Sequence, residues 1–223
     1  DEFFDGAAEE NYYVNNVSPY IDGIFKANGW DKKAACYMWG TTGLVYNSDK
    51  LKNMKDVSTW KILLNEAYKR QVTVKDNVRD AYFATLGIIN SDKLGGEITS
   101  AERSAMLNDV DARTIEEAER VLKKIKENVY SFDTAAGKSD KVRGKVIVKY
   151  QWSAAAGYRI DQAQSDGTTD WFSVPDECAN LWFDGWLMLK RGISGNAQRR
   201  AAAEAFVNFL SRQDNAVRNM EYI

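Results

Sequence analysis

The sequence predicts an α/β fold with a mainly parallel sheet, divided into two lobes. Short apolar or alternating runs, which are typical of strands, alternate with helical patterns along the whole chain. With 223 residues, the chain is long enough for one large domain or two small ones. Two segments, 40–43 and 175–180, have the pattern of passages between sheets. Two passages imply two lobes that are joined twice.

The first predicted elements are a helix and a strand. Ser18 and Pro19 are typical of the N-cap and the first position of a helix, which we expect to end near Gly29. Residues 34–47 follow as a strand, and the small residues Gly-Thr-Thr-Gly at 40–43 predict that this strand is interrupted.

The remaining elements follow from periodicity and from helix start signals. The second of two consecutive helices places Glu119 four residues before Lys123, which favours an exposed helix. In order, we expect a short helix (58–69), a strand (70–75), helices (77–90, 100–110 and 114–129), a strand (145–152), a helix from Ser153, strands (169–175 and within 179–192) and a long amphipathic helix (196–212) with a second one behind it.

The stretch ANLWFDGWLMLKRG, residues 179–192, places an acid inside an apolar strand. Because side chains alternate along a strand, Trp182, Asp184 and Trp186 share one face. The opposite face is predicted to be core, and it consists of Leu181, Phe183, Gly185, Leu187 and Leu189. A carboxylate between two indoles is costly to desolvate unless a cation or a hydrogen-bond donor meets it. A positive ligand would explain Asp184, and so would a buried pair with an arginine.

Two other strand ends carry candidate binding residues. The strand that ends near residue 75 leads to Asn77 and Asp80 at the start of a helix, and Trp152 ends the strand 145–152. Ligands of α/β sheets bind at the carboxyl ends of strands. Carboxylates beside aromatic rings suit an amine, because an ammonium is attracted to both. Each residue also has a simpler interpretation: Asn77 as a helix N-cap, Asp80 as a partner of the helix dipole, and Trp152 as core.

Composition excludes several classes of function. Lys and Arg number 30 against 32 Asp and Glu, without a long basic run, so we expect no nucleic-acid partner. The chain has no histidine, which excludes Ser-His-Asp and Cys-His catalysis and His-based zinc sites. Cys36 and Cys178 lack the spacing of metal ligands. We expect no cofactor and no metal site, and leave a disulfide between the two cysteines open.

The order of five motifs resembles the spermidine/putrescine-binding proteins of bacterial polyamine ABC importers. The motifs are YMWGTTGLVYN, VTVKDNVRDAYFATLGIIN, VIVKYQWSAAAGY, VPDECANLWFDGWLMLKRG and AAEAFVNFL. The resemblance covers nearly the whole chain from about residue 17. It implies a type II periplasmic-binding fold, in which two α/β lobes joined by hinge strands close over a polyamine in the cleft between them.

The resemblance also implies roles for individual residues. Trp152 and Trp182 would be aromatic walls against the ligand's methylenes, and Asp184 would receive an inner amine. Asp80 would hold one end of the ligand. Asn77 falls where the family can have a second acid, so one negative charge would be missing at that end. No residue would be catalytic.

By the same resemblance, residues 1–46 would be part of lobe 1, 47–178 would be lobe 2, and 179–223 would return to lobe 1. Family members continue beyond both ends, so we expect a fragment with an incomplete first lobe. The parent would act at the periplasmic or extracellular face of the bacterial cytoplasmic membrane, peripheral to it, with an ABC permease as partner. One alternative is a solute-binding protein for another small ligand. The other is a glycoside hydrolase that uses Asp80 and Asp184 as its acid/base pair.

Overall fold

The structure, a computed structural model, describes residues 11–133, 145–165 and 167–220. Two compact units make up the chain, and each is described by itself. Unit 1 consists of residues 1–40 and 182–223, and unit 2 of residues 41–181. The chain therefore passes from one unit to the other within strand β1 (Ala35–Asn47) and returns within strand β6 (Leu181–Trp186), which pairs with β1.

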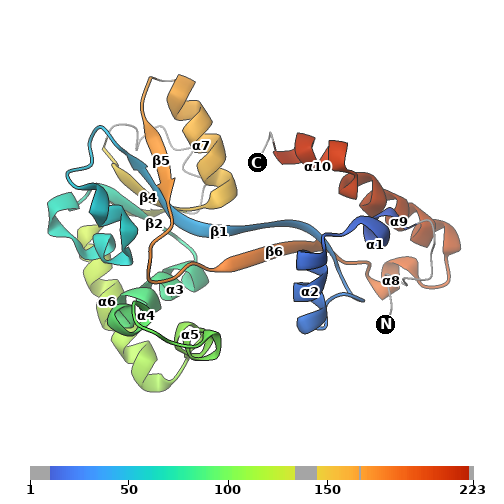
Figure 1. Cartoon of the computed structure of the whole chain (residues 1–223), viewed down its shortest axis with the longest axis horizontal. Coiled ribbons are helices and arrows are strands. Elements are labelled where there is room, and N and C mark those ends of the chain that lie inside the picture. Colours follow the sequence, from blue (N-terminus) through green and yellow to red (C-terminus); the bar gives the residue numbers. More distant parts are fainter. Residues whose placement is uncertain (1–10, 134–144, 166, 221–223) are drawn as a thin grey trace. The chain divides into compact units, whose positions relative to one another are not determined.

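Unit 2 contains most of the sheet. Its strands besides β1 are β2 (Val72–Lys75), β3 (Ser131–Asp133), β4 (Val148–Trp152) and β5 (Asp170–Ser173). Its helices are α3 (Val78–Ile89), α4 (Ser91–Leu94), α5 (Ser100–Leu107), α6 (Ala112–Asn128) and α7 (Ser153–Ser165). Helix α7 lies beside β5 and β4, and α3 packs against α6 (Figure 1).

The sheet is mixed, whereas a mainly parallel sheet was predicted. Its strand order is β3-β2-β4-β1-β5, and β6 pairs with β1 outside that path. Strand β2 runs parallel to β3 and β4, but β1 runs antiparallel to β4 and β5. The reason lies in the register: Thr42, where β1 enters unit 2, stands opposite Trp152, where β4 ends. The two strands must therefore run in opposite directions.

Strand β1 continues through Gly-Thr-Thr-Gly, so the predicted interruption is wrong. The two threonines have high strand propensity and are anchored by side chains of unit 2. Thr41 N donates to Ser153 Oγ at 3.2 Å, and Thr42 N donates to Asn180 Oδ1 at 3.0 Å. Gly43 allows the close approach of β5, because a Cβ there would collide with the Ser173 carbonyl oxygen and the Phe172 ring. Glycine here serves packing between strands.

The short helix predicted over 58–69 is a series of 3-10 turns. They are η1 (Met54–Ser58), η2 (Trp60–Leu64) and η3 (Glu66–Tyr68). The side chains of Asn53, Thr59 and Asn65 each accept a hydrogen bond from the backbone N–H two residues later. Such local bonds compete with an α-helix and start a new turn each time.

The other predicted helices and strands are present, with boundaries that differ by a few residues. Lys123 and Glu119 form the expected ion pair on α6 at 2.7 Å. The sequence patterns missed β3 and the short helices α1 (Tyr12–Asn16), α4 and α8 (Lys190–Ile193). The core of unit 2 surrounds the fully buried Trp60, Tyr68 and Tyr150, and the Trp60 and Tyr150 rings meet edge to face at 4.7 Å.

Unit 1 combines β6 and the first part of β1 with helices. These are α1 (Tyr12–Asn16), α2 (Pro19–Ala27), α8 (Lys190–Ile193), α9 (Ala197–Ser211) and α10 (Gln213–Met220). Its small core contains Tyr13, Ala35, Met188 and Val207. Cys36 and Cys178 both lie in described segments and are free thiols, so the structure contains no disulfide between them.

Candidate functional site

Asn77 begins helix α3 directly after strand β2. Its side-chain Oδ1 accepts hydrogen bonds from the backbone N–H groups of Arg79 at 3.0 Å and Asp80 at 3.2 Å. This is the geometry of an N-cap, the simpler of the two interpretations of Asn77. The cap fixes the first turn of α3 and thereby the position of Asp80. Asn77 itself is exposed.

Asp80 and Trp152 are in direct contact. Trp152 Nε1 donates a hydrogen bond to Asp80 Oδ2 at 3.0 Å, although the two residues lie 72 positions apart. Asp80 is only 5% exposed, and Tyr150 donates its hydroxyl proton to the Asp80 backbone carbonyl at 3.1 Å. Burial raises the pKa of the Asp80 carboxyl, against the opposing effects of the Trp152 hydrogen bond, Lys75 and Arg79. The strand ends predicted carboxylates beside aromatic rings but not the burial of this acid, and its role in ligand binding stays a prediction.

Lys75 belongs to the same cluster and was not predicted. It is only 2% exposed, its Nζ donates to Gln151 Oε1 at 3.0 Å, and Nζ lies 3.7 Å from the centre of the Trp152 ring. Burial lowers the pKa of the Lys75 ammonium, and the charges of Asp80 and Asp133 oppose that shift. The sequence gives no signal for this burial, because a lysine at the end of a strand is normally solvated.

In unit 1, Trp182 and Asp184 lie on β6. Trp182 is half-buried, whereas Asp184 is exposed and forms no ion pair within the part of the chain that the structure describes. A buried pair with arginine therefore does not explain the acid. Asp184 is close enough to Cys36 to act on its thiol, whose pKa is raised to about 11, chiefly by burial and secondarily by the Asp184 charge.

The two faces of β6 differ from the prediction. Trp186, on the face of Asp184, packs edge to face on Phe206 with ring centres 5.3 Å apart. On the face predicted as core, Phe183 packs against Phe25 at 5.7 Å. However, Leu181, at the start of the strand, is 44% exposed, so its prediction as core is wrong. Leu187 and Leu189 are 62% and 75% exposed and lie beyond the end of the strand at Trp186. The strand is shorter than the apolar run suggested, so the last two leucines do not share its alternation.

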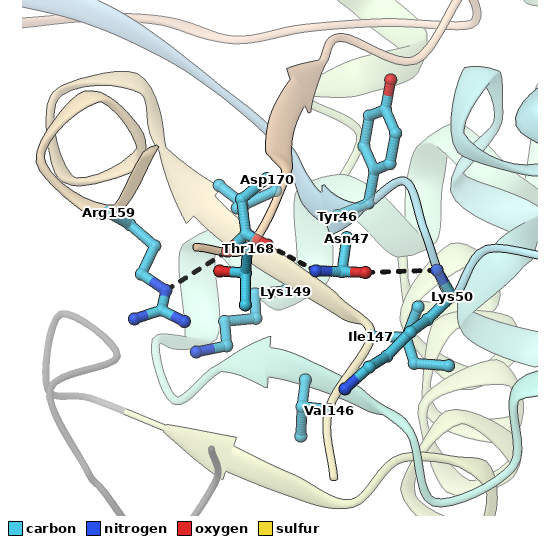
Figure 2. A pocket seen from close by; sticks show the side chains of 10 residues that line it. Tyr46, Asn47, Lys50, Val146, Ile147, Lys149, Arg159, Thr168 and Asp170 are labelled. Carbon is cyan, nitrogen blue, oxygen red and sulfur yellow. Dashed lines mark hydrogen bonds and ion pairs between the residues drawn. The ribbon is translucent and has the colours of Figure 1, made fainter. Parts of the chain in front are cut away.

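A small cavity in unit 2 contains none of the predicted binding residues. It has a volume of about 50 Å³ and lies at the start of β4, whereas Trp152 ends that strand. Figure 2 shows Asp170 in this cavity between Asn47, whose Nδ2 donates to it at 3.1 Å, and Arg159, which forms an ion pair with it at 3.4 Å. The acid is thus neutralised by side chains of the protein.

Within the described residues, no group of His, Cys, Asp and Glu side chains could hold a metal ion. None of the helices in the described ranges combines the length and the apolarity that crossing a bilayer requires. Asp80, Asn77 and Trp152 thus form one cluster in unit 2 with Lys75, and Trp182 and Asp184 lie together on one strand of unit 1.

Curated relatives resemble most of the chain. The spermidine/putrescine-binding periplasmic protein of Salmonella typhimurium is 28% identical over 180 residues, which cover 81% of this chain and 45% of the relative. The putrescine/agmatine-binding protein of Pseudomonas aeruginosa is 23% identical over 217 residues, with coverages of 93% and 55%. The chain spans about half the length of these relatives.

Solved structures show the same fold. The spermidine/putrescine transporter substrate-binding protein PotD from Streptococcus pneumoniae matches with a TM-score of 0.69 and 24% identity, over 96% of this chain and 57% of that one. The Tp0655 (TpPotD) lipoprotein of Treponema pallidum matches with a TM-score of 0.65 and 16% identity, over 92% and 58%. These matches confirm the predicted periplasmic-binding type of fold.

A family model described as "Bacterial extracellular solute-binding protein" matches residues 4–223. That match spans both units and includes all five predicted binding residues. The chain belongs to the family of bacterial extracellular solute-binding proteins.

Proposed function

We propose that the protein carrying this chain is the substrate-binding component of an ABC importer that captures a linear polyamine, putrescine or spermidine. It binds the amine outside the cytoplasmic membrane and delivers it to a permease. In this proposal unit 2 contributes Asp80 and Trp152, with Asn77 at the same helix start, and unit 1 contributes Trp182 and Asp184.

The contact between Asp80 and Trp152 carries the proposal. Trp152 Nε1 holds one carboxylate oxygen, Oδ2, at 3.0 Å and so fixes the acid against the indole. Each carboxylate oxygen can accept more than one hydrogen bond, so the group retains capacity for an ammonium. An amine that reaches it gains a charge-assisted hydrogen bond, and its methylenes can lie against the ring. An anion would be repelled by the carboxylate, whereas a neutral sugar could also use a ring and an acid, so the preference for an amine over a sugar is supported by the likeness to polyamine-binding relatives.

The arrangement in unit 1 also supports a cationic ligand. Asp184 is exposed beside the half-buried Trp182, and the described residues give it no ion-pair partner. An exposed carboxylate next to an indole can bind an ammonium without first breaking a salt bridge. The relatives from Salmonella typhimurium and Pseudomonas aeruginosa are named for binding spermidine, putrescine or agmatine, all of which carry amino or guanidino groups.

We propose that binding is the whole activity and that no covalent chemistry takes place. A solute-binding family delivers its ligand unchanged, and the protein's output is then a change of conformation on binding. The glycoside-hydrolase alternative requires Asp80 and Asp184 to act as an acid/base pair on a sugar. Turnover of a small glycoside that disappears in Asp184→Asn would favour it over the binding role.

Isothermal titration of putrescine and of spermidine into the full-length protein tests the proposal. Wild type should bind at least one of the two amines. Asp184→Asn keeps the shape of the side chain and removes its charge, so it should weaken binding about 10- to 100-fold, as expected for loss of a hydrogen bond worth about 1.5–3 kcal/mol.

Asp214→Asn is the matched control, because Asp214 is an exposed acid of unit 1 on α10. It should leave the affinity within about twofold of wild type. If wild type binds neither amine, the polyamine assignment is wrong, while the family and the fold stand.

A further inference from the structure

The Trp152 ring of unit 2 already has a cation on one face. Lys75 Nζ lies 3.7 Å from the ring centre, which is within the range of a strong cation–π contact. The Lys75 ammonium is fixed in this position, because the residue is only 2% exposed and its Nζ donates a hydrogen bond to Gln151 Oε1 at 3.0 Å. Gln151 Oε1 also accepts from the backbone N–H of Trp152, at 3.3 Å. The amide thus fixes the ammonium and the indole in one arrangement.

This cation also changes the charge balance around Asp80. Lys75 and Asp80 contact the same indole, Lys75 at the ring face and Asp80 at Nε1. Their charges sum to zero, as do the charges of Arg79, which acts on Asp80, and Asp133, which acts on Lys75, and Asn77 at the helix start adds none. The cluster therefore attracts a ligand ammonium less than its aromatic ring and carboxylate alone would suggest.

We propose that Lys75 is a specificity-determining residue, an internal ammonium on Trp152 that disfavours a further ligand ammonium there and so selects a diamine over a longer polyamine. This inference depends on the proposed polyamine function. A diamine that binds Asp80 with one ammonium can place its methylenes over the remaining face of Trp152 and its second ammonium beyond the ring. Spermidine that binds Asp80 in the same way through its shorter, three-carbon end would instead bring its inner ammonium onto a ring that already binds a cation.

The size of the effect follows from the geometry. An ammonium on the opposite face, at a similar distance from the ring, would lie roughly 7 Å from Lys75 Nζ. At that separation, with an effective dielectric constant of about 20, repulsion between unit charges lowers affinity by more than tenfold before solvent screening is included. Removing the Lys75 charge should therefore raise the affinity for spermidine about tenfold relative to putrescine.

The test uses Lys75→Met in the full-length protein, because methionine keeps the length and apolar stem of lysine without its charge. Isothermal titration gives the ratio of spermidine to putrescine affinity for wild type and variant. Lys75→Arg keeps the charge and is the matched control, so its ratio should remain that of wild type. If Lys75→Met does not fold, Lys75→Gln serves instead, since its amide can still donate to Gln151.

The outcomes separate this inference from the proposed function. A ratio that rises about tenfold in the neutral variant and stays constant in Lys75→Arg supports the role of Lys75. Wild-type binding with an unchanged ratio in the neutral variant would overturn that role and leave polyamine binding intact. Absence of binding by wild type and by the neutral variant would overturn both.

Discussion

The hydrogen bond between Trp152 and Asp80 can be tested by replacing Trp152 with phenylalanine. The substitution removes the Nε1–H group, which donates to Asp80 Oδ2 at 3.0 Å, and keeps an aromatic ring beside Lys75. A hydrogen bond to a charged group contributes about 1.5–3 kcal/mol, and the acceptor here is buried. Phenylalanine also binds a cation less strongly than tryptophan. We expect the free energy of unfolding to fall by about 2–3 kcal/mol at pH 7.

Urea denaturation followed by far-ultraviolet circular dichroism measures this loss without depending on tryptophan fluorescence. Trp171→Phe is the matched control, because Trp171 is an exposed residue on β5. It should change the free energy of unfolding by about 0.5 kcal/mol or less. Repeating Trp152→Phe in an Asp80→Asn background completes a double-mutant cycle. Because asparagine keeps an acceptor oxygen, the cycle measures the charge-dependent part of the hydrogen bond, and we expect a coupling energy of about 1 kcal/mol.

Two results would refute the reasoning. One is a Trp152→Phe variant that loses no more stability than Trp171→Phe. The other is strict additivity of Trp152→Phe and Asp80→Asn, because residues joined by a hydrogen bond should not behave independently.

The remaining predictions concern pH dependence, strand packing and a buried acid. Burial raises the pKa of Asp80 above its ordinary value of 3.8, so its stabilising contribution is fully present below that value and is lost as pH rises through the raised pKa. Asp80→Asn should therefore gain stability relative to wild type between pH 3 and pH 7 in urea denaturation, and a constant difference would contradict this. Gly43→Ala should lower the free energy of unfolding by about 2 kcal/mol or more, because the new methyl group would push β5 away. The control Gly157→Ala lies in open space on helix α7 and should raise the free energy of unfolding by about 0.5–1 kcal/mol. Equal melting temperatures of the two variants would argue against the packing role of Gly43. Glu177 accepts hydrogen bonds from the Thr59 hydroxyl and the Trp60 backbone N–H, and Glu177→Gln should lower the free energy of unfolding by about 1–3 kcal/mol because the bonds lose their charge-assisted character. An unchanged urea midpoint would show that the charge of Glu177 contributes nothing to these bonds.

Elements with strong local signals were predictable from sequence. Ser18 and Pro19 marked the start of α2, and the apolar spacing over 77–90 marked α3. The region 58–69 failed because Thr59 and Asn65 bond to nearby backbone groups, and that competition cannot be weighed from periodicity alone. The direction of β1 was also inaccessible, since strand direction depends on which strand lies next to it.

The candidate residues were identified more completely than their contacts. Asp80 and Trp152 were each singled out by their place at a strand end, but no local pattern could show that Trp152 Nε1 bonds the carboxylate across 72 residues. Lys75 was missed because lysine at the end of a strand is normally solvated, and only the structure shows its ammonium buried against the indole. Roles in ligand binding remain a prediction for Asn77, Asp80, Trp152, Trp182 and Asp184 alike.

The division of the chain into units has a consequence for the order of folding. Unit 2 is one continuous segment, residues 41–181, whereas unit 1 is assembled from residues 1–40 and 182–223. During synthesis, all of unit 2 is made before the second part of unit 1, and domains generally fold as units once they are complete. Unit 2 is therefore expected to fold first. The part of β1 that belongs to residues 1–40 lacks its partner strand β6 until β6 has been translated, so unit 1 cannot be completed earlier.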